Sequence, residues 1–251
     1  MQMAFASFPY LSCILLSCVV GLLIILFLPR HRKQEIKWVS AVFSGIPLAL
    51  SLYLFLAYDK STGGLQFVEK IIWVKSLGIT YFNAADGFNL PNLLLTGIVF
   101  FTGVLTMWEM QKRVKEFYAL YFFLVTGVFG LFMSMDLFFI FVWYDVSLFP
   151  MYLLIVVWGT TRKEYAAMKL TLYLLAGSAL ILPAIVYLFV TSGMNTFDIV
   201  TLMQPGTFTV EEQKFAFILL FIGFGILAAV WPFHTWSPVG HVAAPHAVSM
   251  V

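Results

Sequence analysis

Hydrophobic and polar residues occur in long blocks along this chain, not in the short periods of an amphipathic helix or strand. Seven blocks of about 20 mostly apolar residues alternate with polar segments, and about 20 apolar residues are enough to cross the hydrocarbon core of a bilayer. Because hydrocarbon offers the backbone no hydrogen-bond partner, each block is expected to be a helix. The pattern therefore predicts membrane-spanning helices at residues 10–29, 38–57, 91–108, 117–135, 137–158, 166–190 and 214–236.

The seventh block is interrupted near its end, because Pro232 and Pro238 supply no backbone N–H to a continuous helix. The sequence after His234, SPVGHVAAPHAVSMV, is typical of a turn back into the membrane and the start of another span. The predicted fold class is therefore an all-α polytopic membrane protein with about seven transmembrane helices, a broken seventh helix and the start of an eighth. Residues 1–108 would hold three helices and a long outer loop, and residues 109–251 the rest, with a short interfacial helix in the loop 192–213.

The composition agrees with a chain that lies in lipid. Hydrophobic residues make up 62% of the chain and charged residues 10%, against about 25% charged residues in soluble domains. The basic residues form short loop clusters and no basic face, which excludes a nucleic-acid-binding surface. The chain has no glycine-rich phosphate loop, no GxSxG and no CxxC, so we expect no redox or hydrolytic chemistry, no metal and no cofactor in this chain. Cys13 and Cys18 are predicted to be packing residues.

Positively charged residues mark the loops that follow every second predicted helix. Loops rich in Lys and Arg stay on the cytoplasmic side, so the N-terminus is predicted to lie outside. We expect a multi-pass protein of a bacterial inner membrane, although an organelle-encoded protein would show the same pattern. The basic residues that set this orientation are Arg30, Arg32, Lys33, Lys37, Lys112, Arg113, Lys115, Arg162 and Lys163.

A single acidic residue, Asp145, lies about eight residues inside its predicted span. An ionised Asp at the centre of a membrane helix costs roughly 2.5–3.5 kcal/mol, and such residues usually serve ion or proton pathways. Two interpretations remain open. Asp145 could be a protonated acid hydrogen-bonded to a neighbouring helix, or it could belong to a proton relay or ion-coupling site.

Other polar positions near the membrane interior are candidates for the same pathway. Lys169 could pair with an intramembrane acid, or its long side chain could reach the interface from its place one turn inside the sixth span. His234 and His241 could relay protons near a water-filled pocket, since imidazole titrates near neutral pH, or could make polar contacts at the helix break. Pro150 is expected to kink the helix close to Asp145.

Five sequence motifs occur in an order that resembles a known family. The chain is similar to the antiporter-like M-type (chain 4) subunit of NADH:quinone oxidoreductase, respiratory complex I, and to related subunits of multi-subunit Na+/H+ antiporters. The similarity is strong from about residue 65 and implies the N-terminal half of the antiporter-like fold, with residues 109–251 as an incomplete first repeat. The motifs are ADGFNLPNLLLTG, RVKEFYALYFFL, DLFFIFVWYDVSLFPMYLLIVVWG, TRKEYAAMKLTLYLLAGS and PFHTWSPVGHVAAPHAVS.

The residues that this family uses for proton transfer are only partly present. The resemblance places Asp145 at the family's essential glutamate and Lys169 at a helix-six lysine, and it retains His241. It places Leu227 at the position of the lysine that pairs with the glutamate, and Val239 at an aspartate. Leucine can neither pair with an acid nor carry a proton. The resemblance therefore implies an altered proton half-channel and is compatible with an inactive one.

Three functions are compatible with these residues. The first is a non-redox membrane-arm subunit of a proton-translocating NADH:quinone oxidoreductase, which bridges similar subunits while NADH, FMN, iron–sulfur clusters and quinone are bound by its partners. A separate chain could then supply the missing C-terminal helices. The second is a subunit of a cation/proton antiporter not coupled to NADH, and the third is a structural scaffold without an ion path.

Overall fold

The computed structural model describes residues 3–5 and 8–251, and within them it contains ten α-helices and three strands. Six of these helices are long and apolar enough to span a membrane, which confirms the predicted polytopic helical fold. Their bounds agree with the first six predicted spans to within a few residues. They are α1 (Tyr10–Phe27), α2 (Lys33–Ala57), α3 (Asn89–Thr106), α4 (Val114–Met133), α5 (Leu137–Trp158) and α6 (Lys163–Ser192).

The seventh block forms α8 (Val210–Leu227), which ends nine residues before the predicted position 236. Its first turns carry Glu211, Glu212 and Lys214, so part of this helix is too polar to count with the six spans. After α8 the chain turns through Ala229, whose φ is 53°, and Pro232. Two short helices follow, α9 (Trp236–Ala243) and α10 (His246–Met250). The helix break is therefore present, but it lies closer to the N-terminus than predicted.

A small antiparallel sheet, which the all-α prediction omitted, is formed by residues 3–5 together with two strands of the long loop between α2 and α3. Its strands are β1 (Met3–Phe5), β2 (Gln66–Val74) and β3 (Ile79–Ala85), paired in the order β1-β2-β3, with the 3-10 turn η1 (Lys75–Leu77) between the last two. The β-branched and aromatic residues of β2 and β3 favour strands. The turn needs Gly78, because its φ is 65° and a Cβ there would lie 1.9 Å from the Asn195 carbonyl oxygen.

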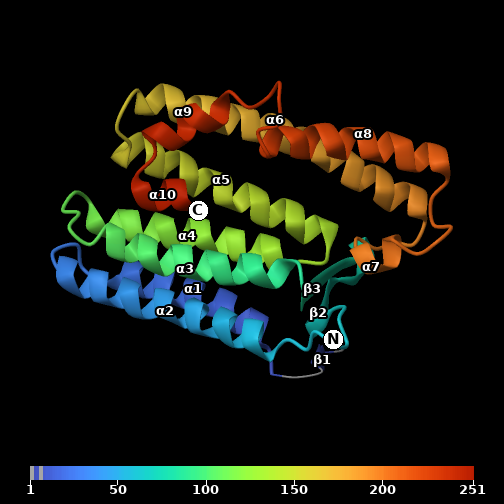
Figure 1. Ribbon diagram of the computed structural model, residues 1–251, viewed down its shortest axis with the longest axis horizontal. Helices are drawn as coiled ribbons and strands as arrows, with labels where there is room; N and C mark the ends of the chain where they lie inside the picture. Colours follow the sequence, from blue (N-terminus) through green and yellow to red (C-terminus); the bar gives the residue numbers. More distant parts are fainter. Residues whose placement is uncertain (1–2, 6–7) are drawn as a thin grey trace.

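The elements form a flat bundle with different structures at its two ends (Figure 1). The sheet and α7 (Ile199–Leu202), the interfacial helix predicted in the loop 192–213, lie at one end. This end is named the outer end after the side of the membrane on which the sequence pattern predicts it. The loops between α1 and α2, α3 and α4, and α5 and α6 lie at the other end. Helix α4 packs on α1, α3 and α5, whereas α6 and α8 form a pair that reaches the bundle through α5. The sequence-predicted acid, lysine and leucine therefore come from this second half, α5, α6 and α8.

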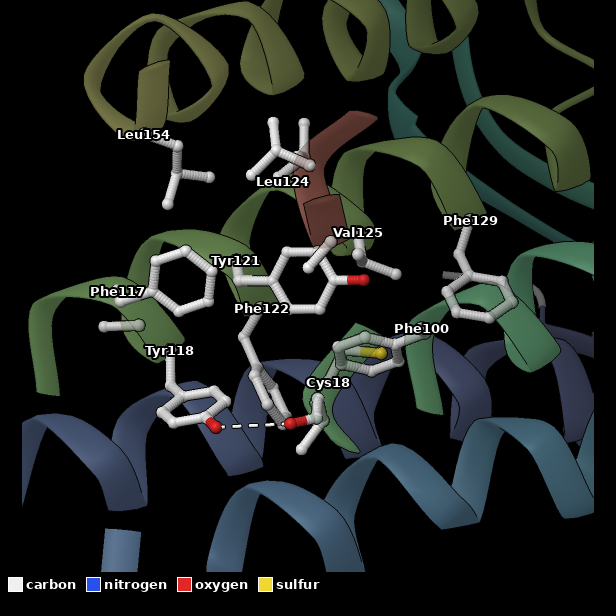
Figure 2. Packing of buried hydrophobic residues seen from close by; sticks show 14 of the residues in the cluster. Cys18, Phe100, Phe117, Tyr118, Tyr121, Phe122, Leu124, Val125, Phe129 and Leu154 are labelled. Atoms are coloured by element: carbon white, nitrogen blue, oxygen red, sulfur yellow. Dashed lines mark hydrogen bonds between the residues drawn. The ribbon is translucent and has the colours of Figure 1, made fainter. Parts of the chain in front are cut away.

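The core of the bundle is built around the aromatic side chains of α4 (Figure 2). Tyr118 and Tyr121 are fully buried, yet both hydroxyls have partners. The Tyr118 hydroxyl donates to the carbonyl oxygens of Val104 and Met107 at 3.2 Å, and the Tyr121 hydroxyl donates to that of Val99 at 3.3 Å. Buried hydroxyls are costly unless they are hydrogen-bonded, so these contacts tie α4 to α3. Cys18 is a buried free thiol in the same cluster, as expected for a packing residue.

Candidate functional site

Asp145 lies in the interior of α5, nine residues after the residue that caps this helix. At 1.5 Å per residue it is about 13 Å from the outer end, near the middle of the span. Its side chain is half-buried, and the Oδ1 atom is fully buried without a hydrogen-bond partner among the residues that the structure describes. The Ser178 hydroxyl of α6 lies beside the carboxyl. The structure thus places an acid at mid-span, and none of the salt bridges among the described residues includes it.

A cavity of about 480 Å³ lies next to this acid, between α4, α5, α6 and α8. Two polar side chains line it, Tyr144 and Ser178, and the Tyr144 hydroxyl is buried without a partner in the described part of the chain. The remaining wall is apolar and consists of Leu131, Phe132, Ile140, Phe141, Ile181, Phe224, Leu227 and Ala228. The cavity therefore offers one or two hydroxyl contacts inside a mostly hydrocarbon wall.

Leu227 is the last residue of α8 and lines this cavity. The family resemblance places a lysine at this position. Helices α6 and α8 approach closely at Gly177 and Gly223, and a Cβ on Gly177 would lie 2.5 Å from Leu227 Cδ2. The side chain of Leu227 is therefore wedged against α6. Leu227 thus lines the same cavity as Ser178, but a leucine side chain can neither pair with an acid nor carry a proton.

Lys169 does not supply the missing charge. It lies on α6 nine residues before Ser178, which corresponds to about 13 Å along the helix axis. Its ammonium group is 6.0 Å from the centre of the Tyr165 ring, and no acid lies within 4 Å of it among the described residues. The structure therefore does not bring Lys169 and Asp145 together as an ion pair.

The two candidate histidines, one before α9 and one inside it, are exposed on the surface of this chain. His234 precedes α9, and its carbonyl oxygen accepts from Ser237 N at 3.1 Å. His241 is inside α9, and its Nδ1 atom lies 3.2 Å from the Ser249 hydroxyl. Across the described residues no hydrogen bond joins either imidazole to Asp145. Their predicted role in proton transfer thus has no contact that carries it in this chain.

The three prolines that were expected to break helices occupy different settings. Pro232 lies in the non-helical segment between α8 and α9. Pro238 lies in the first turn of α9, where the missing N–H has no intrahelical acceptor to lose. Pro150 is buried within α5, which continues as one helix from Leu137 to Trp158. Of the three prolines, Pro232 is the one that lies where the helical structure is interrupted.

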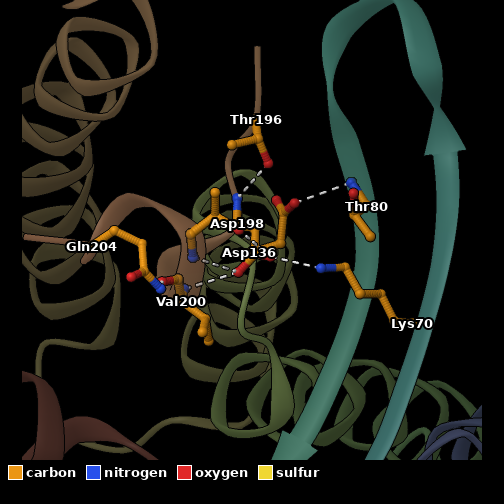
Figure 3. A network of polar contacts seen from close by, with 8 residues as sticks. Lys70, Thr80, Asp136, Thr196, Asp198, Val200 and Gln204 are labelled. Carbon is orange, nitrogen blue, oxygen red and sulfur yellow. Dashed lines mark hydrogen bonds and ion pairs between the residues drawn. The ribbon is translucent and has the colours of Figure 1, made fainter. Parts of the chain in front are cut away.

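A second set of acids, at the outer end, was not singled out by the sequence patterns. Asp136 is completely buried and caps α5 by accepting from Phe138 N at 3.0 Å and Phe139 N at 3.3 Å, while its Oδ2 accepts from Thr80 N of β3 at 3.0 Å. Asp198 lies beside it and caps α7 (Figure 3). The Asp198 Oδ2 atom accepts from Lys70 Nζ at 2.7 Å. The β2–β3 hairpin is thereby joined to the starts of two helices.

Glu69 makes the corresponding contact with α1. Its carboxylate accepts from Leu11 N at 2.8 Å and from Ser12 N at 2.9 Å, and it also accepts from the Ser12 hydroxyl. Carboxylates at helix N-termini satisfy free N–H groups and interact favourably with the helix dipole. The hairpin thus holds the outer ends of α1, α5 and α7 through three carboxylates.

Burial and hydrogen bonding act on these outer acids in opposite directions. Burial raises the pKa of Glu69 and of Asp136 above their ordinary values, despite the hydrogen bonds that favour their charged forms. Burial would also raise the pKa of Asp198, but the contacts with Lys70 and Thr201 outweigh it and hold that pKa below its usual range. The salt bridge to Lys70 is therefore a net stabilising contact for the ionised form of Asp198.

The capping acids could have been recognised in part from the sequence. Asp136 and Asp198 each stand directly before an apolar run, in SMDLFF and TFDIVT, and Asp in that position is a signal for a helix start. No sequence pattern connects Lys70 with Asp198, because 128 residues separate them. The cavity likewise depends on how four helices pack.

Known proteins of similar sequence and fold agree with the predicted resemblance. A family model described as NADH:quinone oxidoreductase/Mrp antiporter, TM, matches residues 134–251. The chain is 34% identical to NAD(P)H-quinone oxidoreductase chain 4 2 of Trichodesmium erythraeum, in a match that covers 98% of this chain and 44% of that protein. The chain thus spans less than half the length of this curated relative.

Solved structures show the same relation. A chain of the respiratory complex I of Thermus thermophilus with bound NADH superposes with a TM-score of 0.82 and 25% identity, over 96% of this chain and 48% of that one. A chain of the Mrp complex of Dietzia sp. DQ12-45-1b has a similar fold, with a TM-score of 0.80 and 21% identity, over 96% and 45%. Residues 134–251 therefore match the transmembrane model of the NADH:quinone oxidoreductase/Mrp antiporter family, and the chain as a whole is similar to NAD(P)H-quinone oxidoreductase chain 4 over less than half of that protein's length.

Proposed function

We propose that this chain is a membrane-arm subunit of a proton-translocating NADH:quinone oxidoreductase, and that its first half-channel does not conduct protons through an acid–lysine pair. The observation that carries the second part is the environment of Asp145. Leu227 occupies the place of a partner, Lys169 lies elsewhere on α6, and the carboxyl has a buried oxygen without a partner among the described residues. The chain then contributes to the arm mainly as a bridge between neighbouring subunits.

In this proposal the chain performs no redox step itself. NADH, FMN, iron–sulfur clusters and quinone would be bound by partner subunits. Within the described residues, no group of three or more His, Cys, Asp or Glu is arranged to hold a metal ion. The support for these partners is the similarity to NAD(P)H-quinone oxidoreductase chain 4, in a match that covers 98% of this chain.

We also propose an orientation with the N-terminus outside a bacterial inner membrane. The loop end of the bundle, residues 28–37, 107–116 and 159–164, carries nine Lys or Arg and four Glu, a net charge of +5. The sheet end, residues 58–90, 136, 198 and 210–214, carries four Lys and seven Asp or Glu, a net charge of −3. Because basic residues accumulate on the cytoplasmic side, the sheet would face outward.

Proton flux in reconstituted vesicles tests the proposed state of the half-channel. We expect Asp145→Asn to leave the flux of the wild-type chain unchanged, because the acid has no partner to exchange a proton with. Leu227→Lys should raise the flux, since a cation then lies beside the acid, and Asp145→Asn should remove that gain. Leu227→Met is the neutral control of similar size. A wild-type flux that falls on Asp145→Asn would show instead that the half-channel conducts as it stands.

A second candidate is a subunit of a cation/proton antiporter that is not coupled to NADH, favoured by the similar fold of the Mrp complex chain. Mass spectrometry of the complex purified with this chain in mild detergent separates the two. NADH-oxidising and iron–sulfur subunits in that complex support the oxidoreductase. Small membrane subunits alone support the antiporter.

A further inference from the structure

The cavity beside α5 has the size and wall of a site for a small apolar molecule. Its volume of about 480 Å³ lies within the roughly 300–1,000 Å³ that is usual for ligand sites. Phe224 and Ala228, which form part of its wall, are exposed on the surface of the chain. A molecule could therefore enter from the side of α8. Its body would meet hydrocarbon, and its polar end would first meet the hydroxyls of Tyr144 and Ser178.

The Asp145 carboxyl behind the cavity wall favours amines over carboxylates and alcohols as ligands. Ser178 lines the cavity and lies beside the Asp145 carboxyl, so an acid is one side chain away from the cavity. No Lys, Arg or His of the described chain lies within 4 Å of that acid. A carboxylate ligand would be repelled, and an alcohol would gain a hydrogen bond but no charge interaction. An amine would gain both, because hydrogen bonds between charged groups are about twice as strong as neutral ones.

We propose that this cavity binds small apolar amines, with the nitrogen directed past Ser178 toward Asp145. A neutral amine entering from the lipid takes the proton of the Asp145 carboxyl. The O–H bond breaks, an N–H bond forms, and an ammonium–carboxylate pair results with no other reactant. The alkyl part fills the space between Phe224 and Leu227. This site is independent of the proposed function, since it requires neither NADH-oxidising partners nor proton flux.

Photolabelling of the full chain in lipid nanodiscs tests the site directly. The probe is an n-octylamine that carries a photoreactive diazirine on its alkyl chain, and the matched uncharged probe is the alcohol with the same skeleton. We expect the amine to label peptides of α5 and α8 that line the cavity, and unlabelled octylamine to compete. The amine should label them about tenfold more than the alcohol, because a charged hydrogen bond is stronger than a neutral one, and tenfold corresponds to roughly 1.4 kcal/mol.

Three variants decide between the possible outcomes. Leu227→Trp should abolish labelling by both probes because the indole fills the cavity, whereas Phe221→Trp, on a 63% exposed residue of the same helix, should not. Asp145→Asn, which is nearly isosteric, should reduce amine labelling to the level of the alcohol. Labelling that survives Leu227→Trp and spreads over the exposed face of α8 would overturn the site. An amine preference that survives Asp145→Asn would overturn the assignment of the acid.

Discussion

The carboxylates in two regions of this protein differ in how many hydrogen bonds they accept. At the outer end, Glu69, Asp136 and Asp198 each accept several hydrogen bonds from backbone N–H groups, and Asp198 also pairs with Lys70. In the middle of α5, Asp145 has a fully buried oxygen with no partner in the described chain. Both groups are acids removed from water, so burial alone does not separate them. What separates them is the number of donors that the surrounding fold provides.

The difference indicates which acids are structural and which one is available for chemistry. A carboxylate whose oxygens are all occupied holds its neighbours in place, and removing it leaves those donors unsatisfied. An acid without partners contributes little to stability and can accept a new one, such as a proton, an introduced lysine or an amine. Mutations at the two places should therefore have opposite profiles: large effects on stability at the outer end, and large effects on binding or transport at mid-span.

Asp136→Ala should show the largest effect. It removes the cap of α5 and leaves the N–H groups of Thr80, Phe138 and Phe139 without their acceptor, so we expect the free energy of unfolding to fall by about 3 kcal/mol. Unfolding of the purified chain in mixed micelles, followed by circular dichroism, measures it. Asp86→Ala is the matched control, because half-buried Asp86 accepts from Phe88 N and Asn89 N at the start of α3. Equal losses in the two variants would contradict the special role of the buried cap.

Lys70→Met should have a smaller effect that depends on pH. Lys70 is 42% exposed, so solvent screens the pair and we expect a loss of about 1 kcal/mol at pH 7. Asp198 has a lowered pKa when folded. Its contribution is therefore present above the ordinary Asp value of about 3.9 and is lost as the pH falls through the lowered value. Melting curves of the variant and the wild type should converge below that pH, and a constant difference would exclude the salt bridge as the cause.

Asp145→Asn should have the smallest effect on stability, less than about 1 kcal/mol, because the buried Oδ1 atom has no hydrogen-bond partner to lose among the described residues. The same micelle unfolding assay measures it beside Asp136→Ala. A loss as large as that of Asp136→Ala would show that Asp145 holds a structural contact, and the contrast between the two regions would disappear. Ser178→Ala tests the neighbouring hydroxyl in the same way and should also be close to neutral.

Helices that depend only on neighbouring residues along the chain could be predicted from the sequence. Uninterrupted apolar blocks are sufficient for α1 to α6, since a helix satisfies its own backbone in lipid. Pro232 and the residues around it indicated the break after α8. The helix itself begins at Val210 and ends at Leu227, closer to the N-terminus than the predicted span 214–236. The sequence patterns also identified Asp145 as an acid at mid-span and Leu227 as the departure from the family. Each of these conclusions depends on residues close together along the chain.

The tertiary structure decided which of these residues meet. The sheet in the outer loop and the contact of Lys70 with Asp198 join segments far apart in the sequence. The packing of α4, α5, α6 and α8 forms the cavity that Leu227 lines. The same packing brings no Lys, Arg or His of the described chain next to Asp145. Helix periodicity sets where side chains lie along one helix, but glycine contacts such as Gly177 with α8 set how closely two helices approach. Whether a buried acid finds a partner therefore depends on long-range packing, which no local pattern contains.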